Sequence, residues 1–124
     1  MSLILDTHIL LWWLGKLRKL PAAAHRAIQS ADAVTVSAAS AWEIAIKRGQ
    51  GKLEAPDDLA DVITGEGFEA LPITFEHARE AGALPRHHRD PFDRMLIAQA
   101  RLERLTVVTV DSRFAKYDVE LLPL

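Results

Sequence analysis

Short apolar runs alternate with helix-like segments along this 124-residue chain, and this alternation limits its fold more than any other feature. The strand candidates are short and rich in apolar or β-branched residues: Ser2–Leu5, Val34–Val36, Glu69–Leu71 and Thr106–Val110, with an edge strand at Val119–Leu122. Strands that are joined by helices pair in parallel, in a sheet covered on both faces. The sequence therefore predicts an α/β domain around a mostly parallel sheet of four or five strands.

Glycine, proline and small polar residues mark the helix ends. We expect helices at Thr7–Leu14, Pro21–Ala31, Ala38–Arg48, Pro56–Ile63, Thr74–Ala83 and Pro91–Arg104. The last is the most regular, because Met95, Ala98 and Leu102 repeat close to the helical period. A polar, basic loop at Pro85–Arg89 leads into it. No repeat or linker interrupts the pattern, so we expect one domain over residues 1–124.

Composition excludes several classes of function. The chain has no cysteine, which excludes disulfide frameworks, thiolate zinc sites and cysteine nucleophiles. A formal net charge of −2 excludes a broadly basic protein that coats nucleic acid. We see no signal peptide before the first strand, and the apolar run Ile9–Leu14 is too short to span a bilayer. We therefore expect a cytoplasmic protein without membrane contact.

Four carboxylates stand where strands end or helices begin. Asp6 follows the first strand and Asp111 follows Val110, whereas Glu43 and Asp93 lie near the starts of two helices. Because the carboxyl ends of parallel strands share one edge of a sheet, we expect these acids to converge. Four acids held together repel each other unless a cation is present, and hard oxygen ligands favour Mg²⁺ or Mn²⁺. This pattern predicts a divalent-metal site suited to phosphate chemistry.

Each acid taken alone also has an ordinary structural interpretation. Asp6 and Asp111 are suited to cap the helical turns that follow them, and Asp90 before Pro91 is a typical N-cap. Asp93 would then be a first-turn acid, favoured by the helix dipole. A helix N-terminus also favours the ionised form that a metal ligand needs, so the two interpretations are compatible.

Glu43 has two such interpretations of its own. It stands three residues after Ser40, which is the spacing of a capping box. It also precedes Lys47 by four residues, the spacing of a favourable ion pair on a helix surface.

The histidines give no sign of a zinc site. His87 and His88 are adjacent, and neither His8 nor His25 has a second histidine three or four residues on. We interpret most of the five as ordinary surface or loop residues. His87 or His88 could still approach a phosphate beside Asp93.

Four segments occur in an order that is typical of one family: Asp6-Thr7-His8, Ser37–Ile44, Asp90–Ala98 and Thr109-Val110-Asp111. In this order they resemble the PIN-domain ribonucleases, and most of all the VapC-type toxins of bacterial and archaeal toxin–antitoxin pairs. The resemblance covers essentially the whole chain. The helix start Asp90-Pro91-Phe92-Asp93-Arg94 marks a subgroup.

The resemblance implies a three-layer α/β/α domain and metal-dependent endonucleolytic cleavage of RNA with one or two Mg²⁺ or Mn²⁺ ions. The family's catalytic, metal-binding acids fall on Asp6, Glu43, Asp93 and Asp111. Of these, we expect Asp6 and Asp93 to be direct ligands. Supporting roles fall on Thr7 and Thr109, where the family often has a hydroxyl, and on Asp90, an additional acid that we interpret as an N-cap.

The resemblance also implies macromolecular partners, namely RNA, a cognate antitoxin and a second copy of the chain, with higher toxin–antitoxin assemblies. Candidate RNA contacts are the basic residues Lys16–Lys19, Lys47, Arg48, Lys52, Arg86, Arg89 and Arg94. The helix Thr7–Leu14 carries Trp12 and Trp13 and is hard to bury completely. Part of it is a candidate for the dimer seam or for an antitoxin groove.

Other functions remain to be compared with a toxin. A PIN nuclease that processes RNA or cuts DNA has the same site. A phosphoacceptor receiver domain would need paired acids after the first strand, where only Asp6 stands. Gly49–Lys52 follows a helix, which excludes a phosphate-binding loop after a strand, and Ser37 and Ser40 lack a nucleophile-elbow context. A non-catalytic binding module is disfavoured because none of the four acids is replaced by an amide.

Overall fold

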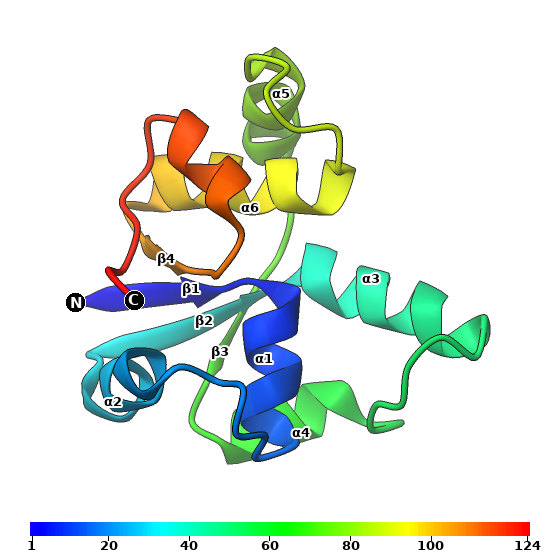
Figure 1. Ribbon diagram of the computed structural model, residues 1–124. Coiled ribbons are helices and arrows are strands. Elements are labelled where there is room, and N and C mark those ends of the chain that lie inside the picture. The colour runs from blue at the N-terminus through cyan, green and yellow to red at the C-terminus, as the bar shows by residue number, and fades with distance from the viewer.

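A parallel four-stranded sheet forms the centre of the computed structural model, which describes residues 1–124 (Figure 1). The strand order is β3-β2-β1-β4. The strands are β1 (Ser2–Leu5), β2 (Ala33–Ser37), β3 (Glu69–Leu71) and β4 (Thr106–Val108). Every neighbouring pair is parallel, which confirms the predicted fold class.

Helices cover both faces of this sheet (Figure 1). One layer contains α1 (Thr7–Leu14), α2 (Ala22–Ser30) and α4 (Leu59–Gly65), and the other contains α5 (Phe75–Ala83), α6 (Pro91–Glu103) and the 3₁₀ helix η1 (Ser112–Lys116). Helix α3 (Ala38–Gly49) continues directly from β2 and extends outward from the carboxyl edge of the sheet (Figure 1). None of these helices has the length and apolar character needed to cross a membrane.

Strand β1 contributes to two separate cores because successive side chains point to opposite faces. Leu3 and Leu5 lie in the core beneath α1, α2 and α4, whereas Ile4 lies in the core beneath α5 and α6. All three side chains are fully buried. Strand β4 divides in the same way, with Val108 in the first core and Val107 in the second.

The chain changes direction across the sheet at β1. From β1 it passes to β2 and β3 on one side, and then returns to β4 on the other side. Open parallel sheets bind ligands beyond the carboxyl ends of the strands at such a switch point. Asp6 follows β1 there, and Thr109 and Asp111 follow β4.

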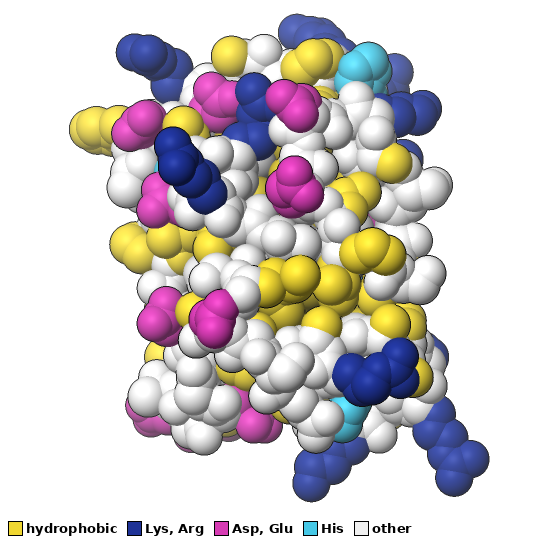
Figure 2. Space-filling model, turned by 90° about the vertical axis from the view of Figure 1, so that its left-hand side faces the viewer, with side chains coloured by type: hydrophobic (Ala, Val, Ile, Leu, Met, Phe, Trp, Pro, Cys, Tyr) yellow, Lys and Arg dark blue, Asp and Glu magenta, His cyan; other side chains and the backbone are white.

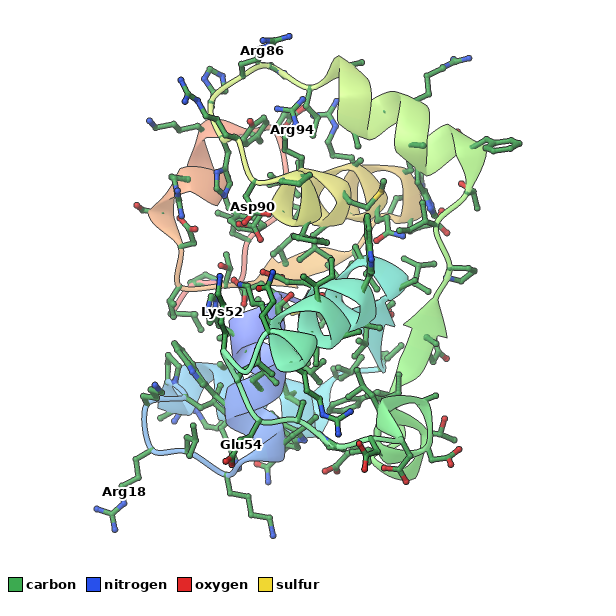
Figure 3. The ribbon with its side chains drawn as sticks, turned by 90° about the vertical axis from the view of Figure 1, so that its right-hand side faces the viewer. Arg18, Lys52, Glu54, Arg86, Asp90 and Arg94 are labelled. Atoms are coloured by element: carbon green, nitrogen blue, oxygen red, sulfur yellow. The ribbon has the colours of Figure 1, made fainter.

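The two edges of the sheet look different. Figure 2 shows the amino-terminal edge, where a band of hydrophobic side chains crosses the middle and acidic side chains lie above and below it. Figure 3 shows the carboxyl edge, where Asp90 lies between Arg94 and Lys52 in the view. The candidate site lies at this second edge.

Two predicted strand boundaries are wrong. The edge strand Val119–Leu122 reduces to a single parallel bridge between Leu121 and Val107. Strand β4 ends at Val108, not at Val110. The Asp6 N–H donates to the Val108 carbonyl oxygen at 3.1 Å, and the Thr109 hydroxyl then accepts the Asp111 N–H at 3.0 Å. This turn takes Val110 out of the sheet.

Candidate metal centre

Asp6 lies in the turn between β1 and α1, and its carboxylate has only neutral hydrogen-bond donors. Oδ1 accepts the Ile9 N–H at 3.0 Å, which makes Asp6 the predicted N-cap of α1. Oδ2 accepts the Thr109 hydroxyl at 2.6 Å. The side chain is buried, and this burial raises its pKa above the ordinary value, although the Thr109 and Ile9 hydrogen bonds and the nearby His8 act in the opposite direction.

Asp93 lies in the first turn of α6, beside two other acids. Asp90 caps this helix, as predicted, by accepting the Phe92 N–H at 2.8 Å and the Asp93 N–H at 3.1 Å. The pKa of Asp93 is raised to about 6, chiefly by burial and also by the charges of Asp90 and Asp6, while the His88 hydrogen bond acts in the opposite direction. Asp93 is therefore an acid that folding makes harder to ionise.

Glu43 is buried on α3, and its charge is neutralised by Lys47, one turn further along the same helix. Lys47 Nζ donates to Glu43 Oε2 at 2.7 Å, which confirms the predicted i, i+4 pair. This hydrogen bond is the main reason why the pKa of Lys47 is raised. The charges of Asp90 and Asp93 contribute in the same direction, so Lys47 also lies within electrostatic reach of both.

The predicted capping box at Ser40 is wrong, because α3 starts three residues earlier than that pattern requires. Ser37 is the N-cap, and its hydroxyl accepts the Ala39 N–H at 3.0 Å. Ser40 is buried and accepts the Thr7 hydroxyl at 3.0 Å. The hydroxyl of Thr7 therefore ties α1 to α3, whereas that of Thr109 contacts an acid directly.

Asp111 caps η1 and has an arginine partner. Its Oδ1 accepts the Arg113 N–H at 2.9 Å and the Arg113 Nε–H at 3.0 Å, and its Oδ2 accepts from Nη2 at 2.8 Å. The Arg113 side-chain hydrogen bond is the main reason why the pKa of Asp111 is lowered. Asp111 therefore stays ionised without any added cation.

The sequence indicated that His87 or His88 could approach a phosphate beside Asp93, but not that His88 is buried against the acids. His8, His25 and His87 are exposed, but only 4% of His88 is accessible. Its Nε2 lies 2.6 Å from Asp93 Oδ2 and 3.9 Å from Asp111 Oδ2. The sequence signal was present, since His88 precedes Asp93 by five residues, but nothing local shows that the loop folds back onto the acid.

Arg94, a candidate RNA contact, is hydrogen-bonded within the fold. Its guanidinium donates to five acceptors, namely the carbonyl oxygens of Ala81, Leu84, Pro85 and His88 and the Tyr117 hydroxyl, at 2.9–3.4 Å. These contacts join α6 to the loop that follows α5. The guanidinium is therefore used inside the fold.

The other basic candidates fall into two groups. Lys47 and Arg48 have acidic partners, Glu43 and Asp57 respectively. Lys52, Arg86 and Arg89 are exposed. Arg86 and Arg89, together with Arg94 and His88, line a pocket of about 450 Å³ that has no hydrophobic lining residue.

An aromatic pair, of which Trp42 is exposed and Phe92 is half-buried, adjoins two of the acids. Trp42 precedes Glu43 on α3, and Phe92 precedes Asp93 on α6. Their ring centroids are 5.4 Å apart in an edge-to-face arrangement. The Trp42 side chain is nevertheless 62% exposed, so one aromatic surface faces solvent beside the acids.

The donor set of this centre fits a hard divalent cation. Asp6 and Asp93 are close enough for the charge of one to raise the pKa of the other, and neither forms an ion pair with lysine or arginine. Divalent magnesium and manganese take carboxylate oxygens and would supply the missing positive charge. These residues therefore fit the metal that the sequence predicts.

Comparison with known proteins agrees with this architecture. Residues 3–120 match the PIN domain family. The chain is 30% identical over 119 residues to Ribonuclease VapC22 of Mycobacterium tuberculosis, covering 94% of this chain and 92% of the relative. Similar solved structures include VapBC2 of Rickettsia felis, bound to a promoter DNA fragment (TM-score 0.70, 16% identity, 98% and 97% of the two chains), and FitAcB of Neisseria gonorrhoeae (TM-score 0.70, 20% identity, 98% and 96%). The chain belongs to the PIN-domain family and, within it, to the VapC-type group.

Proposed function

We propose that this protein is a metal-dependent endoribonuclease and the toxin of a toxin–antitoxin pair. The observation that carries the proposal is the placement of Asp6 after β1 and of Asp93 in the first turn of α6, two acids out of full contact with solvent and without a lysine or arginine partner. The similarity to Ribonuclease VapC22 supports RNA as the substrate. The similarity in fold to a toxin–antitoxin complex from Klebsiella pneumoniae supports the biological context.

The acids have different tasks in this proposal. A bound Mg²⁺ or Mn²⁺ ion would neutralise the scissile phosphate and lower the pKa of a water molecule. Asp6 and Asp93 would hold the cation, and the Thr109 hydroxyl fixes the orientation of Asp6. Glu43 and Asp111 would orient the attacking water or hold a second ion. The products would carry 5′-phosphate and 3′-hydroxyl ends.

RNA would cross the carboxyl edge of the sheet. Lys52 lies on one side of Asp90 in Figure 3, and Arg86 lies on the other. These exposed cations and Arg89 would bind phosphates, while the open surface of Trp42 would stack on an unpaired base. Single-stranded RNA suits such a path because its bases are free to stack.

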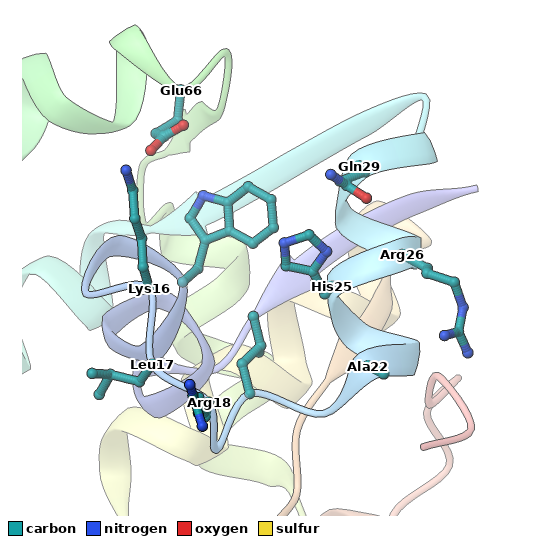
Figure 4. A pocket seen from close by; sticks show the side chains of 10 residues that line it. Lys16, Leu17, Arg18, Ala22, His25, Arg26, Gln29 and Glu66 are labelled. Atoms are coloured by element: carbon teal, nitrogen blue, oxygen red, sulfur yellow. The ribbon is translucent and has the colours of Figure 1, made fainter.

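An antitoxin segment would bind the pocket between α1 and α2. This pocket of about 780 Å³ has Trp13 and Leu20 in its lining, and its basic side chains come from Lys16, Arg18 and Arg26 (Figure 4). A segment that carries both apolar and acidic residues is complementary to this lining. The predicted basic stretch after α1 thus contributes to this pocket, which is separate from the acids.

The protein would also form a homodimer, and its toxin–antitoxin complex would then be a larger assembly. Helix α1 keeps Leu11, Trp12, Trp13 and Leu14 partly buried against the core, so only part of its apolar surface is open to a partner. The start of α5 is more open, with the Phe75 side chain 97% exposed. Sedimentation that shows only monomer across micromolar concentrations would remove the dimer from the proposal.

The nuclease proposal is tested by incubating purified wild-type and Asp93→Asn protein with total RNA and with DNA, with and without EDTA. We expect the wild type to cut RNA, EDTA and the substitution each to stop cleavage, and the new 5′ ends to map to internal sites. Preferred cleavage of DNA would favour the alternative PIN nuclease. Equal cleavage by wild type and variant at matched Mg²⁺ would contradict the mechanism.

A further inference from the structure

His88 is a buried histidine at the metal centre to which the proposed mechanism gives no role. Its Nε2 faces two of the candidate acids, at 2.6 Å from Asp93 Oδ2 and 3.9 Å from Asp111 Oδ2. These acids come from α6 and from the turn after β4, so His88 bridges two separate segments. A buried imidazole between two carboxylates needs a physical reason.

The backbone around His88 is held firmly. The His88 N–H donates to the Tyr117 hydroxyl at 2.9 Å, and that hydroxyl donates to the Pro85 carbonyl oxygen at 2.7 Å. Arg94 donates to the carbonyl oxygens of Pro85 and His88. Below the loop, the Phe114 ring lies 6.2 Å from the His88 ring, centroid to centroid. These contacts hold the backbone that carries the ring, and Phe114 packs beside it, so the ring is positioned before any ligand binds.

The donor atoms have the spacing of a shared cation site. One ligand atom from each of His88, Asp93 and Asp111 lies within 4.8 Å of the others. In an octahedral Mg²⁺ or Mn²⁺ complex, neighbouring ligands lie about 3 Å apart and opposite ligands about 4.2 Å apart. The distances of 2.6 Å and 3.9 Å from Nε2 are close to these two values. To complete the geometry, the cation would also displace the Arg113 guanidinium from Asp111 Oδ2, which accepts from Nη2 at 2.8 Å.

We propose that Nε2 of His88 is a metal ligand and that it binds the cation together with the carboxylates of Asp93 and Asp111. This inference rests on the proposed function and deepens it, because it divides the centre into an all-oxygen position around Asp6 and a mixed position around His88. Imidazole nitrogen is a softer ligand than carboxylate oxygen and favours transition-metal ions, whereas Mg²⁺ is a hard ion that favours oxygen. The mixed position would therefore prefer Mn²⁺. Binding requires the neutral tautomer that carries its proton on Nδ1.

The direct test is electron spin-echo spectroscopy of the full chain loaded with Mn²⁺, which detects nitrogen bound to the metal. We expect ¹⁴N modulation typical of imidazole in the wild type and its loss in His88→Gln. The matched control is His87→Gln, because His87 is adjacent but exposed and packs edge-on against Tyr117 at 5.2 Å between ring centroids. This control should keep the signal.

Metal affinity gives a second readout that does not depend on cleavage. We expect His88→Gln to lower Mn²⁺ affinity by at least about 10-fold, a loss typical of perturbed metal sites, and to lower Mg²⁺ affinity less. Thermal unfolding checks that the variant is folded. If it is not, the wild-type and His87→Gln spectra decide the question.

The outcomes separate this inference from the proposed function. Bound Mn²⁺ without ¹⁴N modulation in the wild type would overturn His88 as a ligand and leave the carboxylate site intact. An unchanged signal in folded His88→Gln would also overturn it. Failure of the wild type to bind Mn²⁺ at all would overturn both this inference and the metal-dependent mechanism.

Discussion

The four candidate acids form two pairs with opposite electrostatics. The unpaired acids, Asp6 and Asp93, have no lysine or arginine partner, and burial raises the pKa of both. The paired acids, Glu43 and Asp111, bind Lys47 and Arg113. Asp6 and Asp93 therefore lack a lysine or arginine counter-charge, and only His88 contacts Asp93, whereas Glu43 and Asp111 are each paired with a basic side chain. This difference indicates that binding of the cation depends mainly on Asp6 and Asp93.

The largest effect should come from removing charge from an unpaired acid. We expect Asp93→Asn to lower RNA cleavage by about a thousandfold or more, since it removes a ligand. Asp90→Asn is the matched control, because asparagine caps a helix as well as aspartate does. Its rate, measured on the same RNA at the same Mg²⁺ concentration, should stay within about 10-fold of wild type. Equal losses in the two variants would remove the distinction between ligand and cap.

A smaller effect should follow from changing a paired acid. We expect Asp111→Asn to lower the cleavage rate by about 10- to 100-fold, a range seen when the surroundings of a metal site are disturbed. Arg113→Met leaves the acid in place and removes its partner. Because Arg113 holds the pKa of Asp111 down, this variant should raise that pKa. A loss for Asp111→Asn as large as that for Asp93→Asn would break the comparison.

The raised pKa of Asp93 predicts a pH dependence of the metal-free protein. The pKa of Asp93 is about 6 in the folded state and has its ordinary value, about 4, in the unfolded state. The folded state therefore binds the proton more tightly, and this stabilises the fold fully below about pH 4. This contribution is lost as the pH rises through about 6. The melting temperature of the wild type, relative to Asp93→Asn, should therefore fall between pH 4 and pH 7. Mn²⁺ added at pH 7 should restore it, and a flat difference would contradict the raised pKa.

The smallest effects should come from the exposed cations. Lys52→Met and Arg89→Met should each weaken RNA binding a few-fold, because each would remove about one phosphate contact. The slope of log affinity against log salt should become shallower by about one unit per contact. Arg79→Met is a control with an exposed arginine on α5. If Lys52→Met and Arg89→Met keep the wild-type slope, as the Arg79→Met control should, then RNA does not contact Lys52 or Arg89.

Local signals in the sequence were sufficient for most helix caps, but not for the end of β4 at Val108. Asp6, Asp90 and Asp111 all cap the turns that they precede, because the residue type and the following helix settle that geometry. Ser40 failed as a cap because β2 runs directly into α3 at Ser37. Sequence patterns do not distinguish two nearby serines when strand and helix join without a loop.

Contacts between distant segments could not be predicted. Arg94 follows Asp93 and looked like a surface base, but its acceptors lie 6 to 23 residues away in the chain. The contact of His88 with the acids was not evident from the sequence, because one of these acids, Asp111, lies 23 residues further along the chain, after β4. Both side chains depend on how the loop after α5 folds back over α6, which no local pattern specifies.

The most direct test of the two-pair account is calorimetric titration of Mn²⁺ into metal-free wild type, Asp93→Asn and Asp111→Asn at pH 7. We predict a clear binding heat for the wild type, none for Asp93→Asn, and weakened binding for Asp111→Asn. Equal affinity in wild type and folded Asp93→Asn would contradict the claim that the unpaired acids hold the cation.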